Sequence, residues 1–387
     1  MPEAELKVMI SAGEESGDLH GAALMREALS RGAPVSFFGL GGDRMEEAGC
    51  RLLAHARETA VMGVSEVLAQ ARRLWRLRER LAAAAADERP DALVLIDSPD
   101  FNFRLAKRAA EAGVPVVYYI CPQIWAWRRG RIKFLAKYAR RRLLILPFEE
   151  EFYRSRGVGC DFVGHPLLDE VKPLPKGEAR AALPMPADGP LLALLPGSRR
   201  GVFARLAPEM LKAAAALARA RPALRVAVAL APTLPGDLAD ECLALFPEDL
   251  RPRLCALRGH SQRIINAASL AVIASGTSAA EAAVLGTPAV VCYRTSPASY
   301  LVARMLVKTK FISIPNLVLG RKLLPELVQG AASAEGIARA AAPYLDGGGE
   351  LSEMRAGLAE VSRALGGPGA SARALDIILE EAGGALK

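Results

Sequence analysis

Short apolar runs alternate with helix-like segments along almost the whole chain, and no other feature constrains the fold as strongly. The segments between the runs, such as 17–30, 104–112 and 204–220, carry apolar residues at helical spacing. Buried strands that alternate with helices are typical of parallel sheets flanked by helices, so the sequence predicts an α/β fold. The expected strands span 6–11, 92–96, 114–120 and 143–146 in the first half, and 191–195, 225–230, 270–274 and 289–293 in the second.

The alternation is interrupted once, between Pro166 and Pro190, where prolines and charged residues concentrate. Such a stretch is typical of a linker, and a chain of 387 residues is long enough for two domains. We therefore expect a domain over 1–168, a second over 169–350, and C-terminal helices over 351–387 that cross back to the first domain. Each half begins with an apolar strand and a small-residue loop, which favours two Rossmann-like domains facing across a ligand-binding cleft.

The net charge of +8 indicates an anionic partner, which could be a nucleic acid, a phosphorylated metabolite or an acidic lipid. The six cysteines show no Cys-x-x-Cys spacing and no nearby histidine, so we expect reduced thiols and no zinc site. The N-terminus lacks the pattern of a signal peptide. The longest uncharged run, 264–280, contains Asn266 and a turn-forming Ser-Gly-Thr, so any membrane contact is expected to be peripheral.

The loop after the first expected strand is rich in small and polar residues. Gly13 and Gly17 allow a tight turn there, and Ser16 or Asp18 could cap the next helix. Exposed N–H groups at a helix start favour anions or sugar hydroxyls, although an ordinary strand-to-helix turn has the same composition. Residues 39–42, Gly-Leu-Gly-Gly, are expected to form another glycine-rich turn, which alone only weakly indicates dinucleotide binding.

Two carboxylates, Asp97 and Asp100, follow the expected strand 92–96. A carboxylate at a strand end can act as a general base when it reaches a substrate hydroxyl. The alternatives are a turn residue for Asp97 and a helix cap for Asp100. Asp97 is the better candidate because it lies closer to the end of the strand.

Two further segments combine large apolar residues with basic ones. The first suits the headgroup layer of an anionic membrane, but also single-stranded nucleic acid or a solvated basic helix. It contains Trp125, Trp127, Arg128, Arg129, Arg131 and Lys133, with no acid among them. The second is either core or an apolar patch that receives acyl chains. It contains Val61, Met62, Val64, Val67, Leu68, Leu74 and Trp75.

Two loops of the second half resemble phosphate-binding turns. Gly197, Ser198 and Arg199 follow one expected strand, and an arginine there could neutralise the charge on a departing diphosphate, unless the loop is simply exposed surface. The other loop follows the strand 270–274, where small residues would present N–H groups and hydroxyls at the start of a helix. Glu281, one turn later, could accept both hydroxyls of a ribose. The small residues of this second loop are Ser275, Gly276 and Thr277.

Metal-dependent sugar transferases generally hold the diphosphate cation with an Asp-x-Asp pair, and this chain has none. The absence favours arginine and helix N-termini as the counter-charge, and therefore a site that needs no metal.

Together, and in this order, the motifs resemble those of the lipid-A-disaccharide synthase family over nearly the whole chain. Each piece is modestly specific, whereas the ordered set is highly specific. The sequence departs from the family's usual pattern at Glu15, where alanine is commoner, and at His20, where an aliphatic residue is expected. The matching motifs are Gly-Glu-Glu-Ser-Gly-Asp at 13–18, Ala-Val-Met-Gly at 60–63, Ile-Asp-Ser-Pro-Asp-Phe-Asn at 96–102, Trp-Ala-Trp-Arg at 125–128, Leu-Pro-Phe-Glu at 146–149, Gly-His at 164–165, Leu-Pro-Gly-Ser-Arg at 195–199, Ser-Gly-Thr at 275–277 with Glu281, and Pro-Asn-Leu at 315–317.

The resemblance implies a GT-B glycosyltransferase of lipid A biosynthesis in a Gram-negative bacterium. Such an enzyme joins UDP-2,3-diacylglucosamine to 2,3-diacylglucosamine 1-phosphate with inversion, giving a β-1,6-linked disaccharide 1-phosphate and UDP. It implies peripheral binding to the anionic cytoplasmic face of the inner membrane, with the apolar patch at 61–75, and no metal, other cofactor or nucleic acid. It assigns catalysis to Asp97 and Arg199, and UDP-sugar binding to Ser16, Gly197, Ser198, Arg199, Ser275, Gly276, Thr277, Glu281, Asn316 and Gln329.

Two alternatives stay open at this point. One is another UDP-sugar enzyme of the same fold, such as a peptidoglycan-precursor transferase or a UDP-sugar 2-epimerase; the lipid-facing segments argue against an epimerase, which needs no membrane patch. The other is a non-catalytic basic protein, for which salt-dependent binding to oligonucleotides without UDP binding would be the signature.

Overall fold

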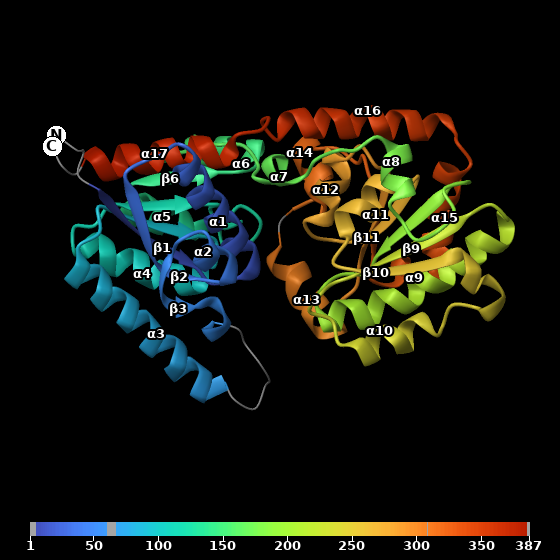
Figure 1. The fold of residues 1–387 in the computed structure, drawn as a ribbon, viewed down its shortest axis with the longest axis horizontal. Helices are drawn as coiled ribbons and strands as arrows, with labels where there is room; N and C mark the ends of the chain where they lie inside the picture. The colour runs from blue at the N-terminus through green and yellow to red at the C-terminus, as the bar shows by residue number, and fades with distance from the viewer. Residues whose placement is uncertain (1–4, 60–66, 308, 385–387) are drawn as a thin grey trace. The chain divides into compact units, whose positions relative to one another are not determined.

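The computed structural model describes residues 5–59, 67–307 and 309–384. It divides into two compact α/β units, each with its own parallel sheet (Figure 1). The first unit comprises Met1–Asp169 together with Gly366–Lys387, and the second comprises Glu170–Leu365. The α/β class predicted from the alternating pattern is confirmed.

The sheet of the first unit has seven strands in the order β3-β2-β1-β4-β5-β6-β7, and every pairing is parallel. Strand order reverses between β1 and β4, so the loops that follow these two strands diverge to opposite sides and leave room for a ligand. The strands are β1 (Leu6–Ala12), β2 (Val35–Gly41), β3 (Arg51–His55), β4 (Ala92–Ile96), β5 (Val116–Tyr119), β6 (Arg141–Leu144) and β7 (Asp161–Phe162).

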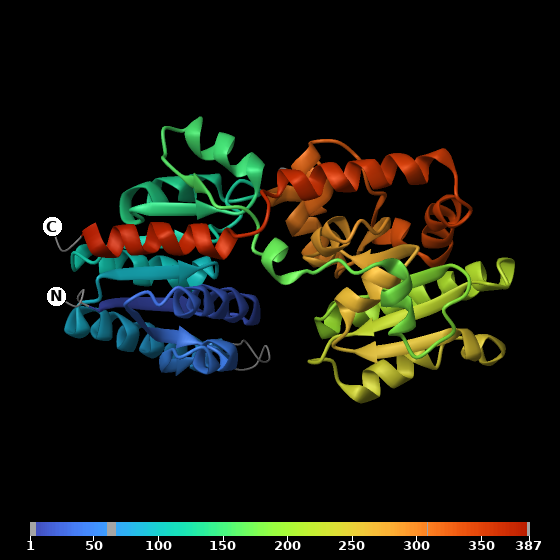
Figure 2. The ribbon, with the colours of Figure 1, turned by 45° about the horizontal axis from the view of Figure 1, so that its top comes forward.

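Helices cover both faces of this sheet, because alternate residues of the central strands point to opposite sides. On one face Met9 and Leu93 pack with α3, α4 and α5; on the other Ile10 and Val94 pack with α1 and α17. Helix α17 returns from the far end of the chain to lie against α1, β1 and β4 (Figure 2). The helices are α1 (Glu15–Ser30), α2 (Asp43–Glu47), α3 (Val67–Glu88), α4 (Pro99–Glu111), α5 (Ile132–Tyr138), α6 (Pro147–Arg154) and α17 (Ala370–Gly384), with α7 (Leu167–Glu170) at the unit boundary.

The second unit repeats this plan with a six-stranded parallel sheet in the order β10-β9-β8-β11-β12-β13, which reverses between β8 and β11. Its core lies largely between the sheet and the pair α9 and α15. The strands are β8 (Leu191–Leu195), β9 (Arg225–Leu230), β10 (Leu254–Arg258), β11 (Leu270–Ala274), β12 (Ala289–Tyr293) and β13 (Glu326–Val328). The helices are α8 (Lys176–Ala181), α9 (Arg200–Ala220), α10 (Gly236–Leu243), α11 (Ser261–Ala267), α12 (Ser278–Val284), α13 (Pro297–Leu306), α14 (Ile314–Leu319), α15 (Ala334–Leu345) and α16 (Gly349–Ala364).

One local expectation is wrong, and another, the crossing of the C-terminal helices, holds for α17 but not for α16. Residues 39–41 of the expected glycine-rich turn belong to β2, where Gly39 adopts φ +142° and a Cβ would lie 2.1 Å from the carbonyl oxygen of Ile10. Glycine therefore permits the close approach of β2 to β1. The C-terminal helices also separate: α16 belongs to the second unit, and the first unit takes up the chain again at Gly366. Within the described residues no helix is long and apolar enough to span a bilayer.

Candidate functional site

The turn between β4 and α4 presents Asp97. Strand β4 ends at Ile96 and α4 begins at Pro99, so only Asp97 and Ser98 connect them. Both are left-handed, with φ +43° and +42°, a conformation that costs a non-glycine residue about 1–3 kcal/mol. A strained turn of this kind persists only when its surroundings hold it in place, which makes its hydrogen bonds informative.

Two buried side chains hold the turn by its backbone. The Asn102 amide donates from Nδ2 to the carbonyl oxygens of Ile96 (3.1 Å) and Asp97 (2.9 Å), and the Tyr118 hydroxyl donates to the same Asp97 oxygen (2.7 Å). The Ser11 hydroxyl in turn donates to Oδ1 of Asn102 (2.7 Å), which ties the end of β1 to the start of α4. The backbone of Asp97 is thus fixed from two sides.

The electrostatics of this turn suit a base. Burial first, and the nearby Glu14 carboxylate second, raise the pKa of Asp97 to about 6, although the Ser98 N–H and His20 act in the opposite direction. Glu14 follows β1, the strand that neighbours β4, so the two carboxylates approach at the carboxyl edge of the sheet. A carboxylate with a pKa near 6 is ionised at neutral pH and still basic enough to accept a proton in a transition state.

The polar residues that follow β1 have two different roles. Ser16 is exposed in the first turn of α1, where a ligand can reach it. Contrary to the prediction, neither Ser16 nor Asp18 caps α1, because both lie inside the helix, and Asp18 is buried. Its carboxylate accepts the N–H groups of Gly42 (2.7 Å), Met45 (3.0 Å) and Arg44 (3.1 Å), and so it caps α2.

In the second unit the loop after β8 places Arg199 at the start of α9. Gly197 has φ +103°, and a Cβ there would lie 2.9 Å from Val202, so the tight turn requires glycine. Ser198 and Arg199 are exposed. Within the described part of the chain the structure gives the Arg199 guanidinium no ion pair or hydrogen bond, which leaves its five donors for a ligand.

The turn after β11 lies beside this loop, because β8 and β11 are neighbours and Leu195 pairs with Ile273. Ser275 fixes the turn: its N–H donates to Cys292 (2.8 Å) and its hydroxyl to Ile312 (3.2 Å). Gly276 and Thr277 remain exposed at the start of α12. The structure thus brings the two candidate diphosphate-binding loops together at the point where the strand order reverses.

Glu281 lies one turn into α12 and is largely buried. Burial raises its pKa to about 7, with the neighbouring Glu170 carboxylate as a second cause. A buried carboxylate that lacks a cation gains by accepting hydrogen bonds, and two vicinal hydroxyls supply them. No group of three or more His, Cys, Asp and Glu side chains in the described ranges has the arrangement of a metal site.

Comparison with known proteins identifies the family. The family model described as lipid-A-disaccharide synthetase matches residues 8–368. The lipid-A-disaccharide synthase of Myxococcus xanthus is 43% identical over 375 residues, which cover 97% of each chain. That of Geobacter sulfurreducens is 41% identical over 379 residues, again 97% of each chain. The chain belongs to the lipid-A-disaccharide synthase family.

Solved structures show that this family member has the GT-B fold. The UDP-GlcNAc 2-epimerase of Neisseria meningitidis, bound to UDP-GlcNAc, aligns with a TM-score of 0.67 at 11% identity and covers 97% of this chain and 100% of its own. The calicheamicin glycosyltransferase CalG4 aligns with a TM-score of 0.61 at 17% identity, covering 98% of each chain. At such low identity these likenesses establish the fold alone, and they confirm the predicted fold class.

The structure contradicts the predicted contact between the Asn316 side chain and UDP. Its side chain is fully buried: Oδ1 accepts from the N–H groups of Leu323 and Leu324, and Nδ2 donates to Leu324 and Glu326. Every polar atom of the amide is therefore occupied inside the unit. Asn316 supports the site by fixing the segment after α14.

Gln329 is partly exposed and has a left-handed backbone, φ +54°. Its amide forms a reciprocal pair with the backbone of Thr295, accepting from the N–H (2.9 Å) and donating to the carbonyl (3.3 Å). A ligand contact from Gln329 would compete with this pair, so its predicted role in UDP-sugar binding stays a prediction.

The two expected membrane segments are only partly surface. Trp75 and Trp127 are exposed by 55% and 40%, but Trp125 is 7% exposed and its indole N–H donates to Glu149 (2.9 Å), so its assignment to the membrane patch is wrong. Leu74 packs against the core of the first unit. Val61, Met62 and Val64 lie outside the described residues, as do the side chains of Val67 and Leu68.

Acids from elsewhere in the fold neutralise part of the basic stretch. Asp100, in the first turn of α4, accepts from Arg128 (3.1 Å) and Arg131 (2.6 Å), and Arg129 donates to the Trp125 carbonyl (3.0 Å). Arg128 also lies over the Trp127 ring at 4.1 Å. Of the four basic residues singled out, Arg129 and Lys133 are exposed and form no ion pair among the described residues.

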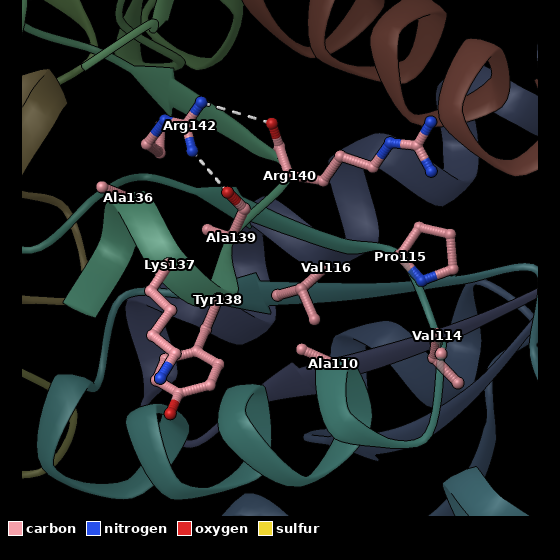
Figure 3. A pocket seen from close by; sticks show the side chains of 11 residues that line it. Ala110, Val114, Pro115, Val116, Ala136, Lys137, Tyr138, Ala139, Arg140 and Arg142 are labelled. Atoms are coloured by element: carbon pink, nitrogen blue, oxygen red, sulfur yellow. Dashed lines mark hydrogen bonds between the residues drawn. The ribbon is translucent and has the colours of Figure 1, made fainter. Parts of the chain in front are cut away.

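Three further basic residues, Lys137, Arg140 and Arg142, help to line a shallow pocket of about 410 Å³ at the opposite end of the strands from Asp97 (Figure 3). Pro115 and Val116 enter it from the start of β5, together with Lys137 and Arg140. Arg142 is largely committed to the backbone, since its guanidinium donates to the carbonyls of Ala139 and Arg140. The pocket is therefore separate from the candidate site.

Three residues of the site received no role from the sequence: Glu14, Asn102 and Tyr118. Glu14 follows the strand next to β4, so assuming the usual Rossmann strand order would have placed it beside Asp97. Asn102 lies inside the motif that contains Asp97, but nothing in the sequence says that its amide turns back to the strand end. Tyr118 lies in an apolar run, where a tyrosine is indistinguishable from core.

Proposed function

We propose that this family member transfers the 2,3-diacylglucosaminyl group of its UDP donor to the 6-hydroxyl of 2,3-diacylglucosamine 1-phosphate. The products are the β-1,6-linked disaccharide 1-phosphate and UDP, with inversion at the anomeric carbon. The observation that carries the proposal is the family match over residues 8–368, supported by the synthases that align with almost the full chain.

Asp97 is the general base of this proposal. Its carboxylate accepts the proton of the acceptor hydroxyl as that oxygen attacks the anomeric carbon. A pKa raised to about 6 by burial, and next by Glu14, supports the role because the group is ionised at neutral pH without being a weak base. The hydrogen bonds from Asn102 and Tyr118 support it by fixing the backbone that carries the carboxylate.

Arg199 and the turn 275–277 hold the departing diphosphate in this proposal. Arginine presents planar donors to phosphate oxygens, and exposed N–H groups at the turn add uncharged donors. Glu281 accepts the ribose hydroxyls, and Ser16 with Gly197 and Ser198 completes the UDP-sugar contacts. With these donors as counter-charge, the transfer requires no metal or other cofactor.

The lipid substrates imply a membrane location, and we assign the enzyme to the cytoplasmic face of an anionic inner membrane. The exposed rings of Trp75 and Trp127 and the amine of Lys133 support peripheral attachment, because aromatic and basic side chains favour the headgroup layer.

A mass-spectrometric assay tests the transfer. Both acylated glucosamines are supplied in detergent micelles with EDTA, and we expect a tetraacyl disaccharide 1-phosphate plus UDP. Asp97→Ala and Arg199→Ala should each lose turnover while staying folded, with a cooperative unfolding transition like that of the wild type. A variant that stays active loses its assigned role. Epimerised UDP-sugar in place of a disaccharide would overturn the assigned reaction and keep the fold, and a strict requirement for added metal would overturn the metal-free site.

A further inference from the structure

Helix α13 of the second unit exposes an unusual amount of apolar surface. The described part of the chain has ten exposed large apolar side chains, and five of them fall in the seven positions 301–307. Scattered apolar side chains on a surface need no explanation, but a contiguous patch marks an interaction site. The exposed fractions are 60% for Leu301, 50% for Val302, 67% for Met305, 49% for Leu306 and 40% for Val307.

An ordinary surface helix turns its apolar side to the core, whereas the apolar side of α13 is exposed. Residues 301, 302, 305 and 306 lie on one side at helical spacing, and this side faces solvent. Tyr300 and Ala303 lie on the other side and are partly buried, whereas no residue of α13 is fully buried. The helix is nevertheless properly started, with Pro297 in its first turn and the Ser296 hydroxyl accepting the Ser299 N–H at 3.2 Å. Its apolar side therefore lacks a partner within the described second unit.

The charged residues of the segment that contains α13 are all basic. From residue 282 to residue 325 the sequence contains no aspartate or glutamate, but it contains Arg294, Arg304, Lys308, Lys310, Arg321 and Lys322. Acids of other elements pair with two of these: Glu209 with Arg294 at 3.0 Å, and Glu360 with Arg321 at 2.7 Å. Arg304, Lys310 and Lys322 are exposed and show no ion pair among the described residues. Arg304 within the helix and Lys310, three residues after Val307, thus place unneutralised positive charge beside the apolar patch in the sequence.

This combination identifies the partner by its chemistry. Apolar side chains on one side of a short helix, with arginine and lysine at its border, fit the interface of a bilayer that carries anionic headgroups. A second copy of the chain fits poorly, because pairing α13 with α13 would bring the same basic residues together without an acid to offset them.

We propose that α13 with Val307 and its basic neighbours is a membrane-binding surface of the second unit, whose apolar side chains insert among the headgroups of an anionic bilayer. The proposal extends the membrane attachment given under the proposed function, yet rests on different residues and does not depend on which sugar is transferred. Each unit then carries its own contact with lipid.

Vesicle co-sedimentation of the full chain tests the proposal. The vesicles contain equal parts of phosphatidylglycerol and phosphatidylcholine, and pure phosphatidylcholine serves for comparison. The double variant Leu301→Ser, Met305→Ser should bind the anionic vesicles at least roughly tenfold more weakly. The matched control is Leu245→Ser, another exposed leucine of the same unit that lies outside the patch, and it should bind as the wild type does.

A second double variant, Arg304→Glu, Lys310→Glu, separates the contribution of charge from that of apolar insertion. It should lose the preference for anionic vesicles and keep the residual binding to neutral ones. UDP binding to each variant, measured by calorimetry, reports that the second unit is folded. Unchanged vesicle binding by the serine variant overturns the proposal. A changed oligomeric state, or a raised KM in detergent with vesicle binding intact, also overturns it and assigns α13 to a second copy or to the substrate's acyl chains. Loss of transfer in micelles by the wild type would count against the proposed function alone.

Discussion

Asn102→Ala is the perturbation that most directly tests how the Asp97 turn is built. The substitution removes the amide that donates to Ile96 and Asp97 and accepts from Ser11, and it touches no group that contacts substrate in the proposed mechanism. Asp97 keeps its carboxylate, and its carbonyl oxygen keeps one donor, the Tyr118 hydroxyl. The variant therefore asks whether the conformation of the turn matters to catalysis.

The magnitude follows from the bonds that are lost. The buried Ser11 hydroxyl loses its acceptor, and three carbonyl oxygens each lose a donor, the bond to the Ser11 carbonyl being the longest at 3.5 Å. A buried polar group left unpaired costs about 1–3 kcal/mol, and a replaceable bond about 1, so we expect a loss of about 2–4 kcal/mol in the free energy of unfolding. Releasing Asp97 and Ser98 from the left-handed region would shift the carboxylate by about an ångström, which lowers kcat by about a hundredfold.

Both effects can be measured on the same sample. The three tryptophans, Trp75, Trp125 and Trp127, all lie in the first unit, so their fluorescence during urea unfolding reports on the unit that contains Asn102. Asn266→Ala is the matched control: Asn266 is buried in the second unit and its Nδ2 donates to the Leu174 carbonyl (3.1 Å). The control should leave kcat and the tryptophan midpoint unchanged.

The decisive comparison is between stability and kcat. If Asn102→Ala shifts the urea midpoint as expected but keeps kcat within about twofold of the wild type, the amide supports only the fold. The argument that the strained turn positions the base would then be refuted. An increase in KM with kcat unchanged would equally contradict it, because positioning of a base acts on the chemical step.

Four other predictions concern charge. The pH profile of kcat/KM should rise through about pH 6, and Glu14→Gln should move that limb to lower pH, since a charge that raises the pKa of Asp97 is removed. Because folding raises this pKa, Asp97→Asn should raise the unfolding midpoint near pH 8 but not near pH 4. Arg199→Lys should lower kcat less than Arg199→Ala, with unfolding unchanged in both. Glu281→Gln should raise the unfolding midpoint near pH 8, since its pKa of about 7 reflects a buried charge, yet weaken UDP binding by calorimetry roughly tenfold.

The sequence predicts the central strands well because burial on both faces leaves an unmistakable apolar run. β4, β8, β9, β11 and β12 fall on the predicted residues. The prediction misses the edge strands β3, β7, β10 and β13, because a strand with one exposed side mixes polar with apolar residues, as Arg51–His55 does. It also misses the interior strand β2, because the glycines at 39 and 41 indicate a turn when the sequence is considered alone. Strand β6 begins earlier than predicted, since Arg141 and Arg142 lie in it with their long side chains paired at the surface.

The sequence predicts where the loops of the site lie better than it predicts the role of each side chain in them. Loop positions follow from strand ends, which composition reveals. The direction of a side chain depends on contacts far away in sequence, and these are invisible there. Trp125 and Asp18 illustrate this: each stands in a motif with exposed neighbours, yet each turns inward to satisfy a partner from another segment.

In each unit a buried asparagine holds a neighbouring segment in place. Asn102 in the first unit and Asn316 in the second are both fully buried, and each uses its amide as donor and acceptor to the backbone or side chains of a neighbouring segment. An amide suits this task because it supplies two donors and an acceptor without a charge that burial would penalise. Loops that must stay exposed to bind a ligand cannot be fixed by burial of their own side chains. A neutral polar anchor beneath the loop, with the reactive group at its surface, gives both rigidity and access.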